Sequence, residues 1–161
     1  MDSIGNLIQL LRSQLALYNE ILELLSKEKR TIIEWKFTDT SSLVKEKEVL
    51  FRKESILDEA RKTLIGIIST EYGLQDANLK AIMDVCQNPD QCRELSELRH
   101  ALFAVAQNIK NENTSLKLLY STNIRLVNDL HAKIGFSPIG KYGMEPKNSY
   151  VPAPSTFSAA G

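Results

Sequence analysis

The fold of this chain is decided by residues 89–134, which read PDQCRELSELRHALFAVAQNIKNENTSLKLLYSTNIRLVNDLHAKI. Through this stretch an apolar or seam position recurs every three and then four residues, with no Gly or Pro inside, which is the heptad pattern of a long helix packed on other helices. At ~1.5 Å per residue the helix would extend for about 70 Å, so the pattern predicts an elongated bundle or coiled coil. Its recurring positions are Leu95, Leu98, Leu102, Val105, Ile109, Glu112, Leu116, Leu119, Asn123, Leu126, Leu130 and Lys133.

The first half of the chain predicts two more long helices. Leucine and isoleucine recur at three- and four-residue steps over 3–35, and leucine recurs again over 40–72, after a cluster of polar N-cap residues. Gly73 ends the second helix, because glycine readily takes the left-handed conformation found at helix ends. Gly66 lies inside that helix, so either another backbone comes close at this point or the helix bends.

The turn before the long helix carries further signals. A short helix over 77–87 is expected to cover one end of the bundle with its apolar side. The long helix over 89–134 then has a clear start, with Asn88 as the N-cap and Pro89 in the first helical position. Gln91 is expected to reach back to the cap amide.

Joined by short connections, these elements predict an all-α fold over residues 1–134, an elongated antiparallel three-helix bundle or coiled coil in up-down-up order with a short extra helix. Residues 135–161 hold most of the prolines and few charges, which predicts a flexible, irregular C-terminal tail. If the last helix is roughly 10 residues longer than its neighbours, about 15 Å of it lacks covering partners at one end, unless the short helix or the tail packs there. That end is where we expect a binding surface.

Composition and charge argue against several classes of partner. Lys plus Arg total 20 and Asp plus Glu total 20, so neither nucleic acid nor an anionic membrane surface is expected to bind. No apolar run approaches the ~18 to 20 residues that cross a bilayer, and the N-terminus lacks a secretory pattern, so we expect no membrane insertion and a cytoplasmic location. Cys86 and Cys92 are expected to be unbonded thiols. Asp58 and Lys62 are expected on the exposed side of their helix.

The sequence holds no constellation for catalysis. His100 and His131 lie over thirty residues apart on one helix, hence ~45 Å apart by helical rise, and cannot share a site. The Glu-x-x-His motif of di-iron bundles, Cys-x-x-Cys pairs and glycine-rich phosphate loops are absent from the sequence. We therefore expect no enzyme activity, no cofactor and no metal; a four-helix enzyme or metal carrier is an alternative that bound metal would reveal.

Polar residues interrupt the seam of the long helix at Glu112 and Asn123, with Asn108, Asn111 and Asn113 close by. One interpretation is that they fix register within the bundle; the other is that this face is not permanently buried and must be soluble alone. After Asn113 the apolar face is wider than a two-position seam requires, so part of it is available to an amphipathic helix of a partner. The candidate partner-binding residues are Leu116, Leu119, Tyr120, Asn123, Ile124, Leu126, Val127, Leu130 and Ile134.

Short motifs along the chain form a series after the Leu-rich first helix. They are Leu43-x-x-x-Lys47-x-x-Leu50, Arg61-x-x-Leu64 before Tyr72-Gly73, Asn113-x-x-Leu116, Leu126-Val127-Asn128-x-Leu130 and Lys141-Tyr142-Gly143. In this series the chain resembles the FlgN family, flagellar export chaperones of bacteria, over nearly its whole length. The family often has one pair of asparagines, three apart, before the last leucines, and this chain departs from that pattern with asparagines spread over 108, 111 and 113.

The resemblance implies a small cytosolic protein without catalysis that binds the C-terminal helical segments of hook-filament junction proteins, of the FlgK and FlgL type, before export. It places binding in the C-terminal part of the last helix, by position at Leu116, Leu119, Asn123, Leu126, Val127 and Leu130. The export apparatus and a weak homo-oligomer are further candidate partners. The main alternative is a homo-oligomeric coiled-coil scaffold or adaptor with no export role, in which the same helix faces its own copies.

Overall fold

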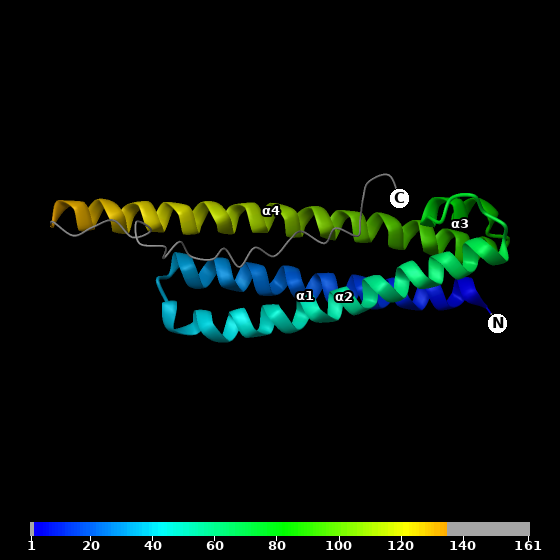
Figure 1. The fold of residues 1–161 in the computed structure, drawn as a ribbon, viewed down its shortest axis with the longest axis horizontal. Coiled ribbons are helices and arrows are strands. Elements are labelled where there is room, and N and C mark those ends of the chain that lie inside the picture. Colours follow the sequence, from blue (N-terminus) through cyan, green and yellow to red (C-terminus); the bar gives the residue numbers. More distant parts are fainter. Residues whose placement is uncertain (1, 135–161) are drawn as a thin grey trace.

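The computed structural model describes residues 2–134, apart from the side chain of Phe37, and this part of the chain is all-α (Figure 1). Its elements are α1 (Ser3–Ile33), a 3-10 turn η1 (Phe37–Asp39), α2 (Thr40–Glu71), α3 (Leu79–Val85) and α4 (Pro89–Lys133). The predicted fold class is confirmed, and each helix begins and ends within two residues of its expected bounds. The tail expected over 135–161 lies outside the described residues.

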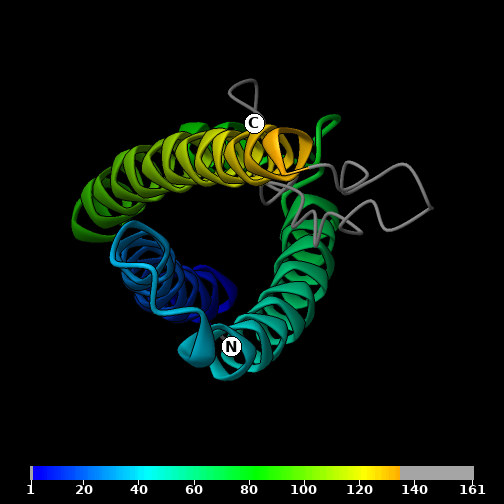
Figure 2. The same ribbon diagram turned by 90° about the vertical axis from the view of Figure 1, so that its left-hand side faces the viewer.

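The helices run in up-down-up order, so α1 and α4 are parallel and α2 is antiparallel to both (Figure 1). α1 packs along α2 on one side and along α4 on the other. Among the described residues α2 and α4 share no close backbone contact. Seen along the bundle, the three long helices sweep around one another instead of lying strictly parallel (Figure 2).

α1 carries the widest buried face, because it must cover two neighbours. Residues along its whole length are almost fully removed from solvent, among them Leu7, Leu11, Tyr18 and Leu25. α4 contributes a narrower line of buried residues, which are Leu95, Leu98, Leu102, Val105, Ile109 and Leu116. Since burying a leucine or isoleucine side chain contributes roughly 1.5 to 3 kcal/mol, the α1–α4 contact is a main source of the bundle's stability.

The starts of α1 and α4 are tied together at the end that α3 covers. Asn88 caps α4 as predicted, with its Oδ1 accepting from the amide of Asp90 at 3.0 Å. The expectation for Gln91 is wrong: its Nε2 donates to Oδ2 of Asp2 at 2.6 Å instead of reaching back to the cap. Asp2 is itself the N-cap of α1, and its charged carboxylate is a strong acceptor for the side-chain amide of Gln91.

α3 closes this end with Leu79 and Ile82, which are buried. Cys86, the C-cap of α3, and Cys92, in the first turn of α4, are free, half-buried thiols. The Sγ of Cys92 donates to the carbonyl oxygen of Cys86 at 3.1 Å. Burial raises the pKa of Cys86 to about 11, so this thiol stays protonated and weakly nucleophilic at neutral pH.

The sequence analysis predicted the wrong environment for one carboxylate of α2. Asp58 is buried instead of lying on the exposed side. Its charge is compensated within one helical turn, because Oδ1 pairs with Arg61 at 3.0 Å and Oδ2 with Lys62 at 2.8 Å. A carboxylate with two such partners can leave the solvent, which the spacing of charges alone did not reveal.

α1 and α2 both end in a Schellman motif, in which the residue after the cap takes the left-handed conformation. At the end of α2 this residue is Gly73, with φ +63°, as the sequence predicted. At the end of α1 it is Trp35, with φ +58°. The closing bonds run from Leu74 N to Ser69 O at 2.8 Å and from Lys36 N to Thr31 O at 3.0 Å.

Gly66 lies in open surroundings inside α2. A Cβ atom placed on it would meet no atom within 4 Å beyond its own helical backbone. Close approach of another backbone, the first of the two explanations suggested by the sequence, is therefore excluded.

We expect Gly66→Ala to raise the free energy of unfolding by about 0.5 to 1 kcal/mol, because alanine loses less backbone entropy in a helix and has room here. Gly73→Ala is the matched control and should lower it by about 1 kcal/mol, because its positive φ disfavours a Cβ. Urea unfolding followed by circular dichroism measures both. A destabilised Gly66→Ala variant would contradict the open surroundings described for this position.

Candidate functional site

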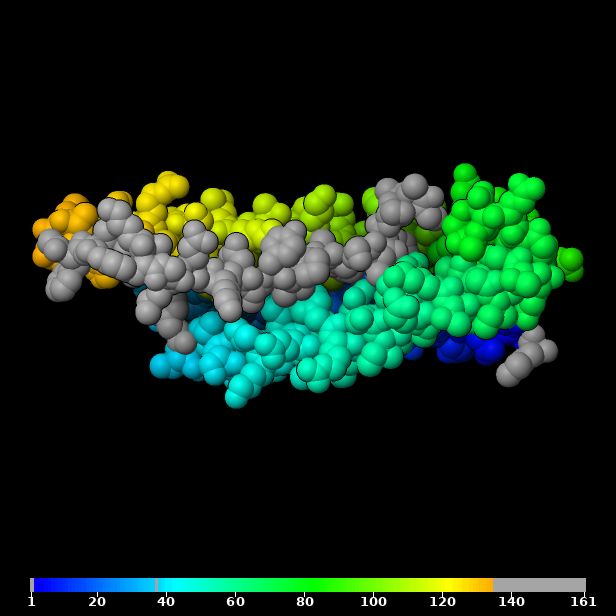
Figure 3. Space-filling model, viewed as in Figure 1, coloured from blue at the N-terminus to red at the C-terminus, as the bar shows by residue number. Residues whose placement is uncertain are grey.

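α4 extends beyond the end of α1. The two helices start level, tied by Gln91 and Asp2, but α4 has 45 residues and α1 has 31. The excess of α4 therefore lies at its C-terminal end, where it projects past the α1–α2 turn (Figure 1 and Figure 3). We call residues 121–134 the α4 arm.

The arm continues the apolar seam of α4 without the helix that covers it. Within the bundle, Leu102 and Ile109 on this seam have no exposed surface. In the arm, Leu126, Leu130 and Ile134 are exposed over 44%, 51% and 67% of their surface. Their four-residue spacing puts them on one face of the helix, which gives the arm an apolar stripe open to a partner.

The structure spreads the nine predicted partner-binding residues over three environments. Leu116 belongs to the core, and Leu119 and Tyr120 are half-buried against it. Asn123, Ile124 and Val127 are half-buried residues of the arm, and Leu126, Leu130 and Ile134 are exposed there. Six of the nine thus lie in the arm, and their role in binding stays a prediction.

Two exposed apolar residues near the arm escaped the sequence analysis. Ile33, the last residue of α1, and Trp35, just after it, are exposed over 57% and 54% of their surface. Nothing in their spacing marked them, because they belong to a helix end and not to a repeating face. The signal that was available is that Trp35 is the chain's one tryptophan.

The root of the arm is fixed by a polar cluster joining the three long helices. The hydroxyl of Tyr120 on α4 donates to Oε1 of Glu28 on α1 at 2.7 Å. Oε2 of the same carboxylate pairs with Nζ of Lys47 on α2 at 2.6 Å. Glu28 and Lys47 are both buried, and burial together with the bond to Glu28 raises the pKa of Tyr120 well above its usual range, so its phenol stays a donor.

The polar residues in and near the α4 seam lie in different environments. Glu112 pairs with Lys29 of α1 at 3.4 Å, which fits the interpretation that it fixes register in the bundle. Asn108 and Asn111 are exposed and lie off the seam. Asn123 lies in the arm, beyond the end of α1, so a role in the α1–α4 register does not account for it.

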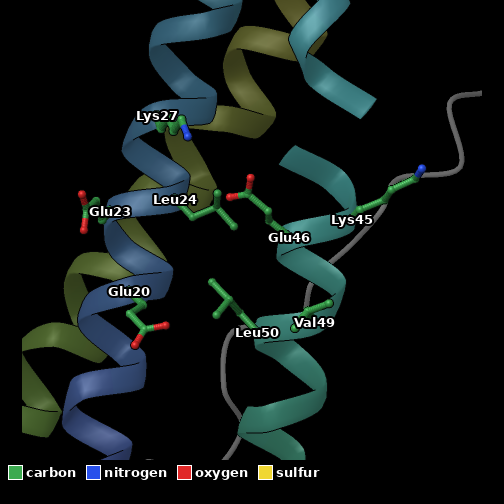
Figure 4. A pocket seen from close by; sticks show the side chains of 8 residues that line it. All are labelled: Glu20, Glu23, Leu24, Lys27, Lys45, Glu46, Val49 and Leu50. Carbon is green, nitrogen blue, oxygen red and sulfur yellow. The ribbon is translucent and has the colours of Figure 1, made fainter. Parts of the chain in front are cut away.

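A hollow of about 480 Å³ lies between α1 and α2 (Figure 4). It is lined by Glu20, Glu23, Leu24, Lys27, Lys45, Glu46, Val49 and Leu50. Leu24 and Leu50 point toward one another across it, with carboxylates and ammonium groups around them (Figure 4). This lining supplies no histidine, cysteine or hydroxyl nucleophile, so we assign no chemistry to it.

Two further properties concern residues 2–134. None of the helices in this range is long and apolar enough to span a membrane. The same range contains no group of three or more His, Cys, Asp or Glu side chains placed to hold a metal ion.

The fold and the arm define an elongated helical-bundle protein with an exposed apolar helix end. A family model described as FlgN protein matches residues 1–138. The chain belongs to this family, the FlgN family of flagellar export chaperones. Comparison with curated proteins and with solved structures gave no match.

We expect Glu28→Ala to lower the free energy of unfolding by about 3 to 5 kcal/mol, because it leaves the ammonium of Lys47 buried without a counter-charge. Arg93→Ala, which removes an exposed pair with Asp90, is the control and should change it by less than about 1 kcal/mol. Urea unfolding measures both. Equal effects of the two variants would mean that the cluster does not hold the three helices together.

Proposed function

We propose that this chain is a cytoplasmic chaperone that binds the C-terminal amphipathic helices of hook-filament junction proteins, of the FlgK and FlgL type, and masks them before export. Membership of the FlgN family supports the general role in flagellar export. The observation that carries the finer proposal is the apolar stripe Leu126, Leu130 and Ile134, which continues a helix-packing seam beyond its partner helix.

The chemistry of the arm suits an amphipathic helix. Its apolar residues recur at one-turn spacing, the pattern by which helices dock along one another. Arg125, Asp129 and Lys133 on the same arm are exposed and keep it soluble when no partner is bound. A junction protein's polymerising helices would aggregate if left exposed, so covering them with such a stripe keeps the subunit soluble until export.

The proposed surface favours moderate affinity. The arm offers about four turns of one helix, a small contact compared with stable protein interfaces. Ordering a disordered segment on it costs ~2 to 5 kcal/mol of the gross contact energy. Binding of this kind is strong enough to mask a helix and weak enough to release it at the export machinery.

A second exposed apolar row favours the alternative of a homo-oligomeric scaffold. Val49, Ile56 and Ile67 on α2 are each exposed over about half of their surface or more. A second copy of the chain could cover them, since such rows mark association surfaces. Light scattering discriminates: a tight dimer or trimer that binds no junction peptide would favour the scaffold, and a monomer that binds it would favour the chaperone.

We expect Leu126→Asp to weaken binding of a junction protein's C-terminal fragment by at least about tenfold, because a charge is then buried in an apolar contact. Helical content should be unchanged, since Leu126 is exposed in the free chain. Isothermal titration calorimetry and circular dichroism measure the two effects.

The control is Leu118→Asp, which changes an exposed leucine of the same helix that lies off the seam. It should leave the affinity near that of the unaltered chain. Equal loss in the two variants, or binding unaffected by Leu126→Asp, would refute the assignment of the arm.

A further inference from the structure

We propose that the partner segment binds the α4 arm as an α-helix lying on the line of α1 beyond Ile33, with Trp35 forming the wall that its end abuts. The inference rests on the proposed function. It adds a binding mode and two contact residues, Ile33 and Trp35, that lie outside the predicted partner-binding set.

The α4 arm continues the interface between α1 and α4. The α4 seam packs on α1 through Leu102, Ile109 and Leu116, and the same heptad line continues to Asn123 and Leu130. What changes along this line is the partner, because α1 ends at Ile33 while α4 runs on to Lys133. A helix placed on the line of α1 would therefore meet the arm as α1 meets the rest of α4.

Trp35 has a left-handed backbone conformation. A bulky residue with positive φ is an outlier, and glycine fills the equivalent place at the end of α2. Here the position holds a large aromatic side chain with about half of its surface exposed. The Schellman motif that ends α1 requires the left-handed conformation but not an aromatic side chain, and strained residues cluster at functional sites, so Trp35 is a candidate contact residue at this end of α1.

The length and side chains of the arm also predict what kind of helix would bind it. The arm is about 20 Å long, so it covers three to four turns of helix. Its seam offers apolar contacts at Leu126 and Leu130 and one polar contact at Asn123. The matching helix should carry apolar residues at one-turn spacing and a polar side chain opposite Asn123, because a polar seam residue selects a polar neighbour.

Trp35 is the chain's one tryptophan, so it reports on its own surroundings. The probe is a synthetic peptide of a junction protein's C-terminal helical segment, with any tryptophan replaced by phenylalanine, titrated into the full chain. We expect a blue shift of the Trp35 emission that follows the binding curve from calorimetry. Leu126→Asp should remove both signals, and Ile56→Asp, an exposed apolar residue of α2, should leave both in place.

The variant Trp35→Gly separates this role from a structural one. Glycine relieves the positive φ, so the unfolding midpoint should rise, as it would not if Trp35 served the fold. The affinity for the peptide should fall by about tenfold, because the aromatic contact at the end of the bound helix is lost. Opposite movement of stability and affinity is the expected result.

Different results would contradict the binding mode and the proposed function. Calorimetric binding without a change in Trp35 emission, and with full affinity in Trp35→Gly, would overturn the binding mode and leave the proposed function standing. No binding to the unaltered chain would overturn both. A red shift of Trp35 on deleting residues 135–161, or a dimer that Leu126→Asp dissolves, would show that the chain's own segment or a second copy occupies the site, and would also overturn the inference.

Discussion

α1 packs on both α2 and α4, which among the described residues share no close backbone contact, so the length of α1 sets the extent of the bundle. Up to Ile33 the seam of α4 is covered and its leucines are buried. Beyond that point the same seam has lost its partner helix and is exposed. The candidate site is thus a direct result of one helix ending about four turns before its neighbour.

The cluster of Glu28, Lys47 and Tyr120 lies where the covered and uncovered parts of α4 meet. A buried ion pair is often no more stabilising than apolar residues of the same shape, so stability alone is a weak reason for it. Its directional bonds instead fix α4 relative to both other helices at the last level where all three are present. Because the arm is fixed at its root in this way, it loses less conformational entropy when a partner binds.

The helices were predictable because their signals are local. The heptad pattern, Asn88 with Pro89, and Gly73 each act within a few residues, and the structure contains the expected elements. Two side-chain environments were not predicted. Gln91 binds Asp2, a residue far away in the sequence. Asp58 is buried although its partners Arg61 and Lys62 are local, because residue spacing does not show which face of α2 is covered. Residue spacing predicted the extra length of the arm. It did not predict that α2 is separated from α4, or that Trp35 has a left-handed conformation at the end of α1.

Hydrogen exchange of the backbone amides tests the central claim, that the α4 arm is an uncovered seam which a partner helix completes. In the free protein the amides of 121–133 should exchange faster than those of 95–116, because few tertiary contacts protect them. Adding a junction protein's C-terminal peptide should slow exchange in the arm and leave the outer side of α2 unchanged. An arm already as protected as the core, or peptide protection confined to α2, would contradict the account.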